Sequence, residues 1–289
     1  MKKVWFCLII IFFFSACMDD ADKEYEDISS VVVEGWIEDG GFPVVILTRP
    51  MPISSVYRRM DKLSDYIVQW AKVTVSCGKD SVVLTGKYDP HYYPPFVYTT
   101  GRMRGEAGKQ YSLTVDYRDI HATAMTTIPA SPPYCSFFIE PYKGTYGRYQ
   151  IKASFRDDSS KRNYYQFLIC EGPESSHYHL SYLGSISNEI ISGKVEVPVY
   201  REPQLLQGRY QPYFTADDVF SIKFAKVDET SFKIWESLTK NLILSSNMFF
   251  STSSDVLTNI SGGYGYWCGY NAQVHHVVIR DSLFSNDLD

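Results

Sequence analysis

The residue with the clearest chemistry in the sequence is Cys17, a thiol directly after a short apolar segment. Two lysines precede an apolar run over residues 4–14, and a Ser-Ala pair stands before the cysteine. The run is shorter than the roughly 20 residues of a membrane-spanning helix, and its order is that of a cleaved secretion signal. Small residues before a cysteine resemble the bacterial lipobox, in which the thiol is acylated. We expect residues 1–16 to be a lipoprotein signal peptide, with an incidental cysteine after an ordinary signal peptide as the alternative.

Acidic residues follow this cysteine closely. Asp19, Asp20 and Asp22 lie in the segment 17–29, which carries further carboxylates. The run resembles the acidic tract that sends lipoproteins of the Bacteroidetes to the outer face of the outer membrane. It also suits a solvated tether, because like charges repel and keep a chain extended. We therefore expect a protein held in the outer membrane by lipid on Cys17 and facing the cell exterior.

Aromatic side chains are the next candidates for binding. The chain holds 23 tyrosines and 17 phenylalanines. One loop presents Tyr92, Tyr93 and Phe96 next to two prolines, and such rings could stack on a sugar, a peptide or a partner protein. Half-buried strand residues are the alternative for most of these aromatics. We take these three residues as possible ligand-binding aromatics.

The sequence contains no catalytic or metal-binding motif. His177 and His179 share one face of an extended segment and His275 adjoins His276, yet a metal needs about three or four converging ligands. Phosphate-loop, nucleophile-elbow and zinc-protease motifs are absent. A glycosidase-like carboxylate pair stays open, because nothing singles one out. We expect no enzymatic activity, no metal and no cofactor.

Composition limits the class of protein further. A hydrophobic fraction of 45% and a charged fraction of 21% are globular values, and the net charge of -5 without a basic cluster argues against nucleic acid as a partner. Four cysteines stand outside the signal and the lipidation site, and we favour buried thiols over disulfides because each lies in an apolar, strand-like run. They are Cys77, Cys135, Cys170 and Cys268.

Alternating apolar residues between turn signals predict a mostly β fold. Residues 30–128 contain three hairpin patterns, which suit an immunoglobulin-like β-sandwich. The proline-rich segment 129–133 predicts a linker, because proline cannot donate to a strand ladder. We expect a second β-rich domain over residues 134–289. The predicted strands of both domains are 30–37, 44–48, 70–76, 81–84, 110–117, 121–128, 136–140, 149–155, 164–170, 195–200, 219–227 and 274–279.

Only one segment has a strong helical pattern. Apolar residues recur at spacings of three and four between residues 229 and 244, with Asp228 or Thr230 available as N-cap. This helix is expected to cover one face of the second sheet.

Several short motifs together resemble one family, the Bacteroidetes outer-membrane lipoproteins catalogued as domain of unknown function 4249. The most specific motif is the last, in which glycine alternates with large aromatics. The motifs are VEGWI at 33–37, AKVTV at 71–75, GKQYSL at 108–113, NYYQF at 163–167 and NISGGYGYW at 259–267. The resemblance implies no assigned activity, no catalytic residues and a place beside TonB-dependent receptors.

The functional expectation is therefore a non-enzymatic accessory or binding subunit of a TonB-dependent receptor barrel. A surface lipoprotein that binds glycan or peptide on its own is the alternative. A hydrolase is the third possibility, and it would need a carboxylate or histidine cluster that only the three-dimensional structure reveals.

Overall fold

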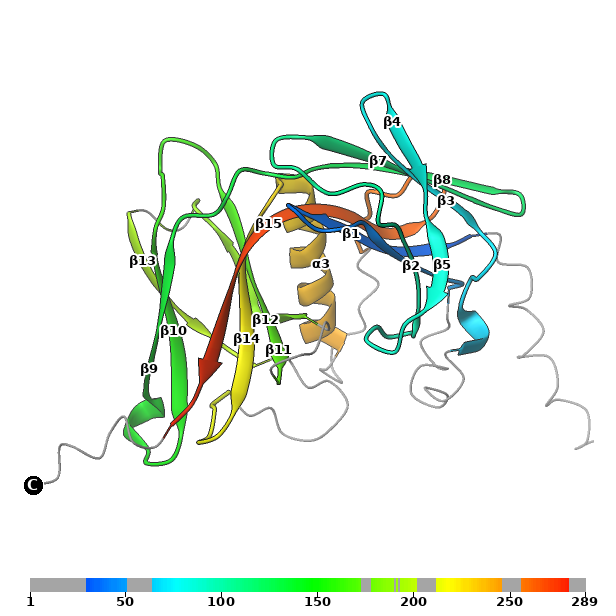
Figure 1. Ribbon diagram of the computed structural model, residues 1–289. Coiled ribbons are helices and arrows are strands. Elements are labelled where there is room, and N and C mark those ends of the chain that lie inside the picture. Colours follow the sequence, from blue (N-terminus) through cyan, green and yellow to red (C-terminus); the bar gives the residue numbers. More distant parts are fainter. Residues whose placement is uncertain are drawn as a thin grey trace, which may run out of the picture.

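The computed structural model describes residues 30–50, 64–172, 178–189, 191, 193–201, 212–245 and 256–280 (Figure 1). The predicted signal, Cys17, the three aspartates of the export signal and His177 lie outside these residues. The described part of the chain is mostly β, as predicted, with one α-helix. It holds no helix with the length and apolar character to cross a membrane.

Besides a 3-10 turn at residues 64–66, the described residues form fifteen strands, one α-helix and the 3-10 helix η3. In chain order these are β1 Val32–Glu38, β2 Val44–Thr48, β3 Lys72–Cys77, β4 Asp80–Val83, β5 Thr85–Tyr88, β6 Phe96–Thr99, β7 Gln110–Tyr117, β8 Ile120–Thr127, β9 Cys135–Pro141, η3 Tyr142–Gly144, β10 Tyr149–Arg156, β11 Tyr164–Glu171, β12 His179–Ser187, β13 Lys194–Val199, β14 Val219–Val227, α3 Glu229–Ser245 and β15 Tyr264–Val278.

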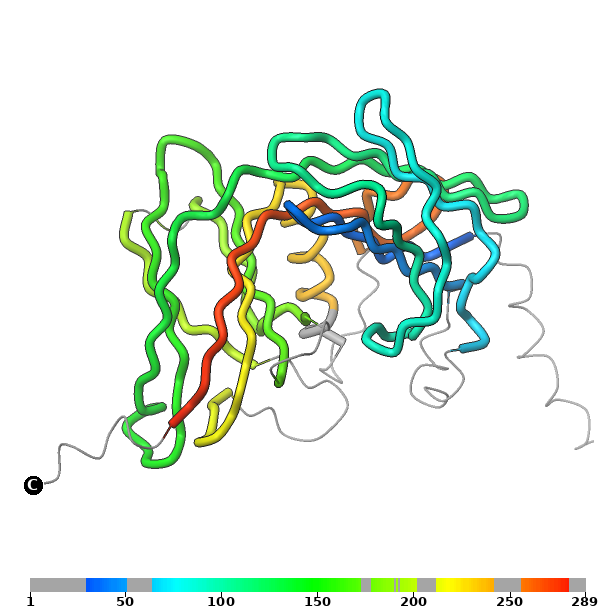
Figure 2. Tube along the Cα trace, viewed as in Figure 1, coloured from blue at the N-terminus to red at the C-terminus, as the bar shows by residue number. Residues whose placement is uncertain are grey.

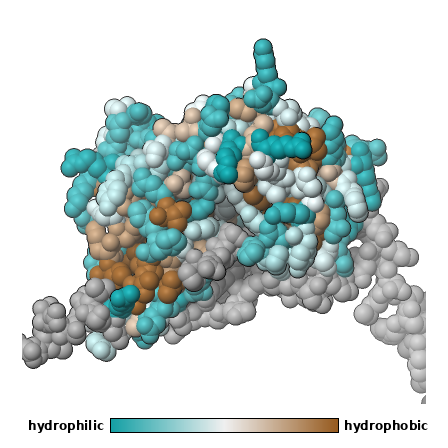
Figure 3. All heavy atoms as spheres, in the orientation of Figure 1, coloured by the Kyte–Doolittle hydropathy of each residue, from teal (hydrophilic) through white to brown (hydrophobic). Residues whose placement is uncertain are grey.

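One long sheet runs through both halves of the molecule. Its strand order is β12-β11-β14-β15-β1-β2-β6-β5. A four-stranded sheet, β4-β3-β7-β8, packs on the β1 half, and a three-stranded sheet, β13-β10-β9, packs on the β14 half. Figure 3 shows the same view in spheres, with the largest apolar patch of this face at the lower left, on the β14 half.

Strand β15 joins the two halves. Its first residues, 264–270, pair in parallel with β1, and residues 270–278 pair antiparallel with β14. Figure 2 traces this strand, in orange to red, from beside the blue β1 to beside the yellow β14. The three hairpins predicted in the first half are confirmed. Residues 129–133 do separate β8 from β9, as the linker prediction implies, but β15 of the second half pairs with β1 of the first half. An immunoglobulin-like topology for residues 30–128 stays a prediction.

Each half has its own apolar core. The first core lies between the long and the four-stranded sheets and includes Val33, Ile37 and Trp267, all at 0% exposure. In the second core the ring of Phe224 stacks on that of Phe167, with 4.9 Å between centroids. Because burying one large apolar side chain contributes about 1.5–3 kcal/mol, both cores stabilise the long sheet that carries the site described below.

The glycine-aromatic motif of β15 is explained by packing on its two faces. Gly265 has φ +102°, and a Cβ there would collide with the carbonyl oxygen of Val33, so only glycine fits. The Trp267 indole N–H donates to the Tyr111 carbonyl at 3.1 Å. The Asn259 side chain accepts from the Trp267 backbone N–H at 2.9 Å and donates to its carbonyl at 2.8 Å. One face of β15 is therefore fixed against the four-stranded sheet, which leaves the other face open.

Helix α3 packs on β11, β12 and β15 on the face opposite the second core, as expected for a covering helix. Asp228 is its N-cap, because its carboxylate accepts the backbone N–H of Ser231 at 2.7 Å. The same carboxylate accepts the hydroxyl of Thr126 at 3.2 Å. This contact links the helix to β8 and holds it beside the open face of β15.

Candidate functional site

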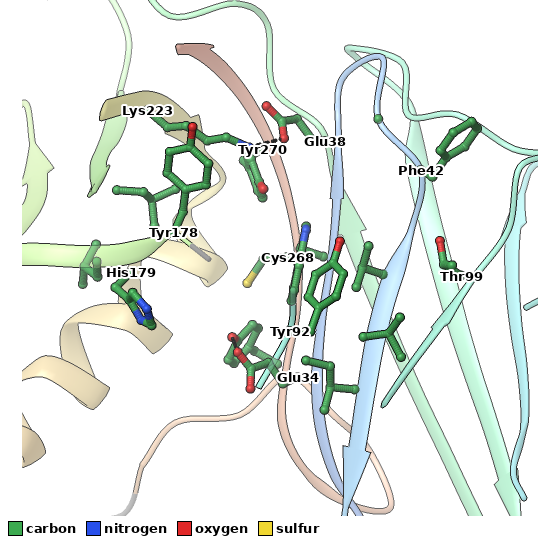
Figure 4. Close-up of a pocket in the computed structure, with 18 of the residues that line it drawn as sticks. Glu34, Glu38, Phe42, Tyr92, Thr99, Tyr178, His179, Lys223, Cys268 and Tyr270 are labelled. Atoms are coloured by element: carbon green, nitrogen blue, oxygen red, sulfur yellow. Dashed lines mark hydrogen bonds and ion pairs between the residues drawn. The ribbon is translucent and has the colours of Figure 1, made fainter. Parts of the chain in front are cut away.

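A cleft of about 1220 Å³ opens on the face of the long sheet that the four-stranded sheet leaves uncovered. Its lining comes from β1, β2 and β6 on one side and from β11, β12 and α3 on the other, with β15 and β14 between them. Figure 4 shows side chains from both halves of the molecule pointing into it. This volume suits a small organic ligand or a short peptide, which commonly bind in concave sites at junctions.

Strand register sets the arrangement of the cleft floor. Successive side chains of a strand point to opposite faces, so alternate residues of β1 and β15 face the cleft. Pairing with β2 and β15 places them in three neighbouring rows across the sheet. These rows are Ile46–Glu34–Tyr266, Val44–Trp36–Cys268 and Glu38–Tyr270.

One end of the cleft holds a neutralised charge pair. The Lys223 ammonium lies 2.7 Å from Glu38 Oε2, and their side chains are only 14% and 22% exposed. The ammonium also lies over the ring of Tyr178, 4.5 Å from its centroid. Burial, together with the hydrogen bond to Glu38, raises the pKa of Tyr270 well above its usual value. Figure 4 shows Tyr178, Tyr270 and the Lys223–Glu38 ion pair close together. The negative charge at this end is therefore balanced inside the protein.

The other end holds a carboxyl group with no such balance. Tyr266 donates its hydroxyl to Glu34 Oε1 at 2.7 Å, and among the described residues no lysine or arginine pairs with this carboxyl. The side chain keeps some exposure to the cleft, yet burial raises the pKa of Glu34, offset only in part by the Tyr266 hydrogen bond and by His179. Burial and Glu34 likewise raise the pKa of Tyr266 well above its usual value. Burial therefore favours the protonated form of this carboxyl.

Two aromatic pairs adjoin Glu34 in the cleft lining, one through Trp36, two residues along the same face of β1, and one through Tyr266, its neighbour on β15. The Trp36 ring lies 6.0 Å from the Tyr92 ring, and the Trp235 ring lies 4.9 Å from the Tyr266 ring, between centroids. The wall beside Trp36 is apolar and is made of Val44, Ile46 and Val97. Glu34 thus adjoins both aromatic pairs and, through its neighbour Ile46 on β2, the apolar wall.

The three aromatics predicted from the sequence separate in the structure. Tyr92 and Tyr93 line the cleft, and Tyr93 is 54% exposed at its rim. Phe96 is not part of the cleft lining, since its ring packs on Tyr98 with 5.5 Å between centroids. Asp89 orders the loop: the Lys87 ammonium lies 3.0 Å from it, and Lys87 together with His91 lowers the pKa of Asp89 to about 2.

Sequence analysis missed most of the cleft residues. Glu34, Glu38 and Trp36 did carry a signal, because two carboxylates share one face of an otherwise apolar strand with a tryptophan. Trp235 and Tyr266 belong to motifs that were interpreted as packing. The sequence does not show that these residues meet.

The thiol on the cleft floor is not activated. Burial raises the pKa of Cys268 to about 12, so it stays protonated, whereas a nucleophilic cysteine needs a lowered pKa. Within the described ranges, Cys77, Cys135, Cys170 and Cys268 form no disulfide.

The histidines of the described chain are dispersed. His179 lines the cleft, while the His275 ring packs on Phe137, with 4.7 Å between centroids. His276 Nδ1 lies 2.9 Å from the Ser221 hydroxyl. A search of the described residues finds no group of three or more histidine, cysteine, aspartate or glutamate side chains that could hold a metal ion.

Comparison with protein families gives one match. A model described as a domain of unknown function (DUF4249) matches residues 19–275. The chain belongs to the DUF4249 family. The match extends over the whole described lining of the cleft, while a search of curated proteins finds no match. The 259–267 motif, on which the resemblance to DUF4249 rested most, contains both the packing residue Trp267 and the cleft residue Tyr266.

Proposed function

We propose that this DUF4249 protein is a non-enzymatic lipoprotein that binds a ligand in its cleft and works with a TonB-dependent receptor. The observation that carries the proposal is the large cleft, whose aromatic lining comes from both halves of the molecule. The lipid on Cys17, the export signal at Asp19, Asp20 and Asp22, and a place on the outer face of a Bacteroidetes outer membrane complete the proposal. They rest on the sequence pattern.

The chemistry of the cleft supports binding over catalysis. The Cys268 thiol stays protonated, and the Glu38 carboxylate is held by Lys223. Glu34 accepts a hydrogen bond from the Tyr266 phenol, whose own pKa is raised, so that phenol stays protonated near neutral pH. Aromatic and apolar walls with few polar groups are typical of ligand sites.

Membrane attachment and partnership are tested in the native membrane. The tagged chain is extracted in mild detergent, captured, and its co-purifying proteins are identified by mass spectrometry. A stoichiometric large barrel is the expected result, and recovery of the chain alone would contradict the receptor partnership. The Cys17→Ala variant is expected to leave the membrane fraction on washing, and its retention there would contradict lipid anchoring.

A glycan-binding protein that works alone is the second candidate, favoured by the exposed ring of Tyr93 at the cleft rim. Retention on immobilised glycans distinguishes the two functions. Loss of retention in Tyr93→Ala, with Tyr146→Ala as a control at another exposed tyrosine, would favour the stand-alone role.

A further inference from the structure

We propose that the Glu34 end of the cleft binds the ammonium group of an organic amine, while the apolar wall holds the body of that ligand. This inference rests on the proposed ligand-binding function and specifies the chemical class of the ligand. Glu34 is the counter-ion, and the adjoining aromatic rings surround the cation.

The first argument is charge complementarity. Glu34 and Glu38 face the same cleft from one strand, but Lys223 neutralises only Glu38. In the described structure the Glu34 carboxyl has a single hydrogen bond, from a neutral phenol. Because an ionised carboxyl away from water is costly without a partner, a ligand cation would be stabilised at this carboxyl, which no lysine or arginine of the described residues pairs with.

The second argument is the arrangement of rings. The pairs Trp36–Tyr92 and Trp235–Tyr266 come from four separate segments of the chain, and each has one member next to Glu34 in the strand register. Aromatic faces attract cations, with tryptophan the strongest, by about 0.5–2 kcal/mol each according to exposure. Lys223 already lies over a tyrosine ring in this cleft, so the lining accommodates an ammonium on aromatic faces.

The third argument is the apolar surface beside the carboxyl. Val44, Ile46 and Val97 form a buried cluster with Trp36 and Tyr92 packed against it. These three side chains are at most 7% exposed, so the apolar surface left to a ligand is that of the partly buried Trp36 and Tyr92 rings. An amine on an alkyl or aryl body would cover these rings, and burial of apolar surface contributes roughly 25 cal/mol per Å². A small hydrophilic cation would leave the surface wet, so the ligand class is an amine with an apolar body.

Protonation of Glu34 is linked to this binding. The titratable groups that face it are Tyr266 and Cys268 from β15 and His179 from β12, while α3 contributes the uncharged Trp235. Burial favours the neutral carboxyl in the empty cleft. An ammonium ligand favours the carboxylate, so binding releases a proton and becomes tighter as pH rises through the pKa of Glu34.

The experiment uses three probes with one body and different charge: 4-phenylbutylammonium, 4-phenylbutan-1-ol and 4-phenylbutyrate. Affinities for the full mature chain are measured by calorimetry near neutral pH. We expect the ammonium probe to bind about tenfold tighter than the alcohol, and the carboxylate to bind weakest. Glu34→Gln should remove the preference for the cation, and Glu34→Asp should retain most of it. Glu196→Gln, on the exposed face of β13, is the control for a change in net charge.

The outcomes separate the two proposals. Equal affinity for ammonium and alcohol, with both lost in Trp36→Ala, would overturn the amine proposal and leave the binding cleft in place. No binding of any probe would contradict the amine proposal alone, because capture from the membrane tests the proposed function. If Glu34→Gln keeps the cation preference while its circular dichroism spectrum matches the parent, Glu34 is not the counter-ion.

Discussion

The two ends of the cleft differ in how a glutamate of β1 is balanced. Glu38 lies 2.7 Å from the ammonium of Lys223, a residue 185 positions away. Glu34, on the same strand face, receives a hydrogen bond from Tyr266, and no lysine or arginine of the described residues pairs with it. A carboxylate balanced inside the protein stabilises the junction of the halves, whereas an unbalanced one is available to a ligand. Two glutamates on one face of β1 thus have different roles.

The largest expected effect follows from removing the charge at the balanced end. Glu38→Gln leaves the largely buried ammonium of Lys223 unpaired, and we expect a loss of about 2 kcal/mol in the free energy of unfolding. This is below the ~3–5 kcal/mol typical of fully buried pairs, because both side chains keep some exposure. Urea denaturation near neutral pH measures the loss.

The double variant Glu38→Gln with Lys223→Met is the control for this effect. It removes both charges together, so most of the stability should return. If Glu38→Gln is as stable as the parent, the charge pair with Lys223 does not set the Glu38 end of the cleft apart from the Glu34 end.

An intermediate effect is expected for Tyr266→Phe. It removes the described hydrogen bond to Glu34 and should lower the free energy of unfolding by about 1 kcal/mol. The variant should also raise the pKa of Glu34 further, because that bond favours the carboxylate. Tyr270→Phe is the matched control, since its partner Glu38 keeps Lys223. If the free energy of unfolding depends on pH equally in the two phenylalanine variants, the proposed difference between the Glu34 and Glu38 ends of the cleft is contradicted.

The smallest effect is expected for Glu34→Gln in the ligand-free protein, and its sign is opposite. In the folded chain the pKa of Glu34 is raised above its usual value of 4.5. The free energy of unfolding therefore falls as pH rises from 4.5 to that folded pKa. Glutamine has no such loss and should therefore raise the thermal midpoint near neutral pH. The gain should vanish in acid, and a lower midpoint at neutral pH would count against a raised pKa.

Local pattern was sufficient to predict much of the fold. Alternation predicted β7, an apolar run before the Gly40-Gly41 turn predicted β1, and spacings of three and four predicted α3, which the structure places at Glu229–Ser245. Strand β5 was missed, because all four of its residues are exposed and leave no apolar pattern. The full length of β15 was missed because its glycines indicate bends unless β1 lies alongside.

The sequence predicted less of the site than of the fold. The loop with Tyr92 and Tyr93 was identified as a candidate from its aromatic residues alone, and the structure places both at the cleft. The roles of Glu34 and Glu38 depend on Tyr266 and Lys223, which lie 232 and 185 positions away in the chain. Pairings over such separations arise only from the sheet order.

The most direct test of the account is the titration of Glu34 itself. Glutamate labelled with carbon-13 at the carboxyl gives a resonance that Glu34→Gln identifies by its absence, and its pKa is followed with and without 4-phenylbutylammonium. We predict a pKa above 4.5 in the empty protein and a downward shift when the amine is added, with the Glu38 resonance unchanged. A Glu34 carboxyl that titrates at or below 4.5, or that ignores the amine, would contradict the account.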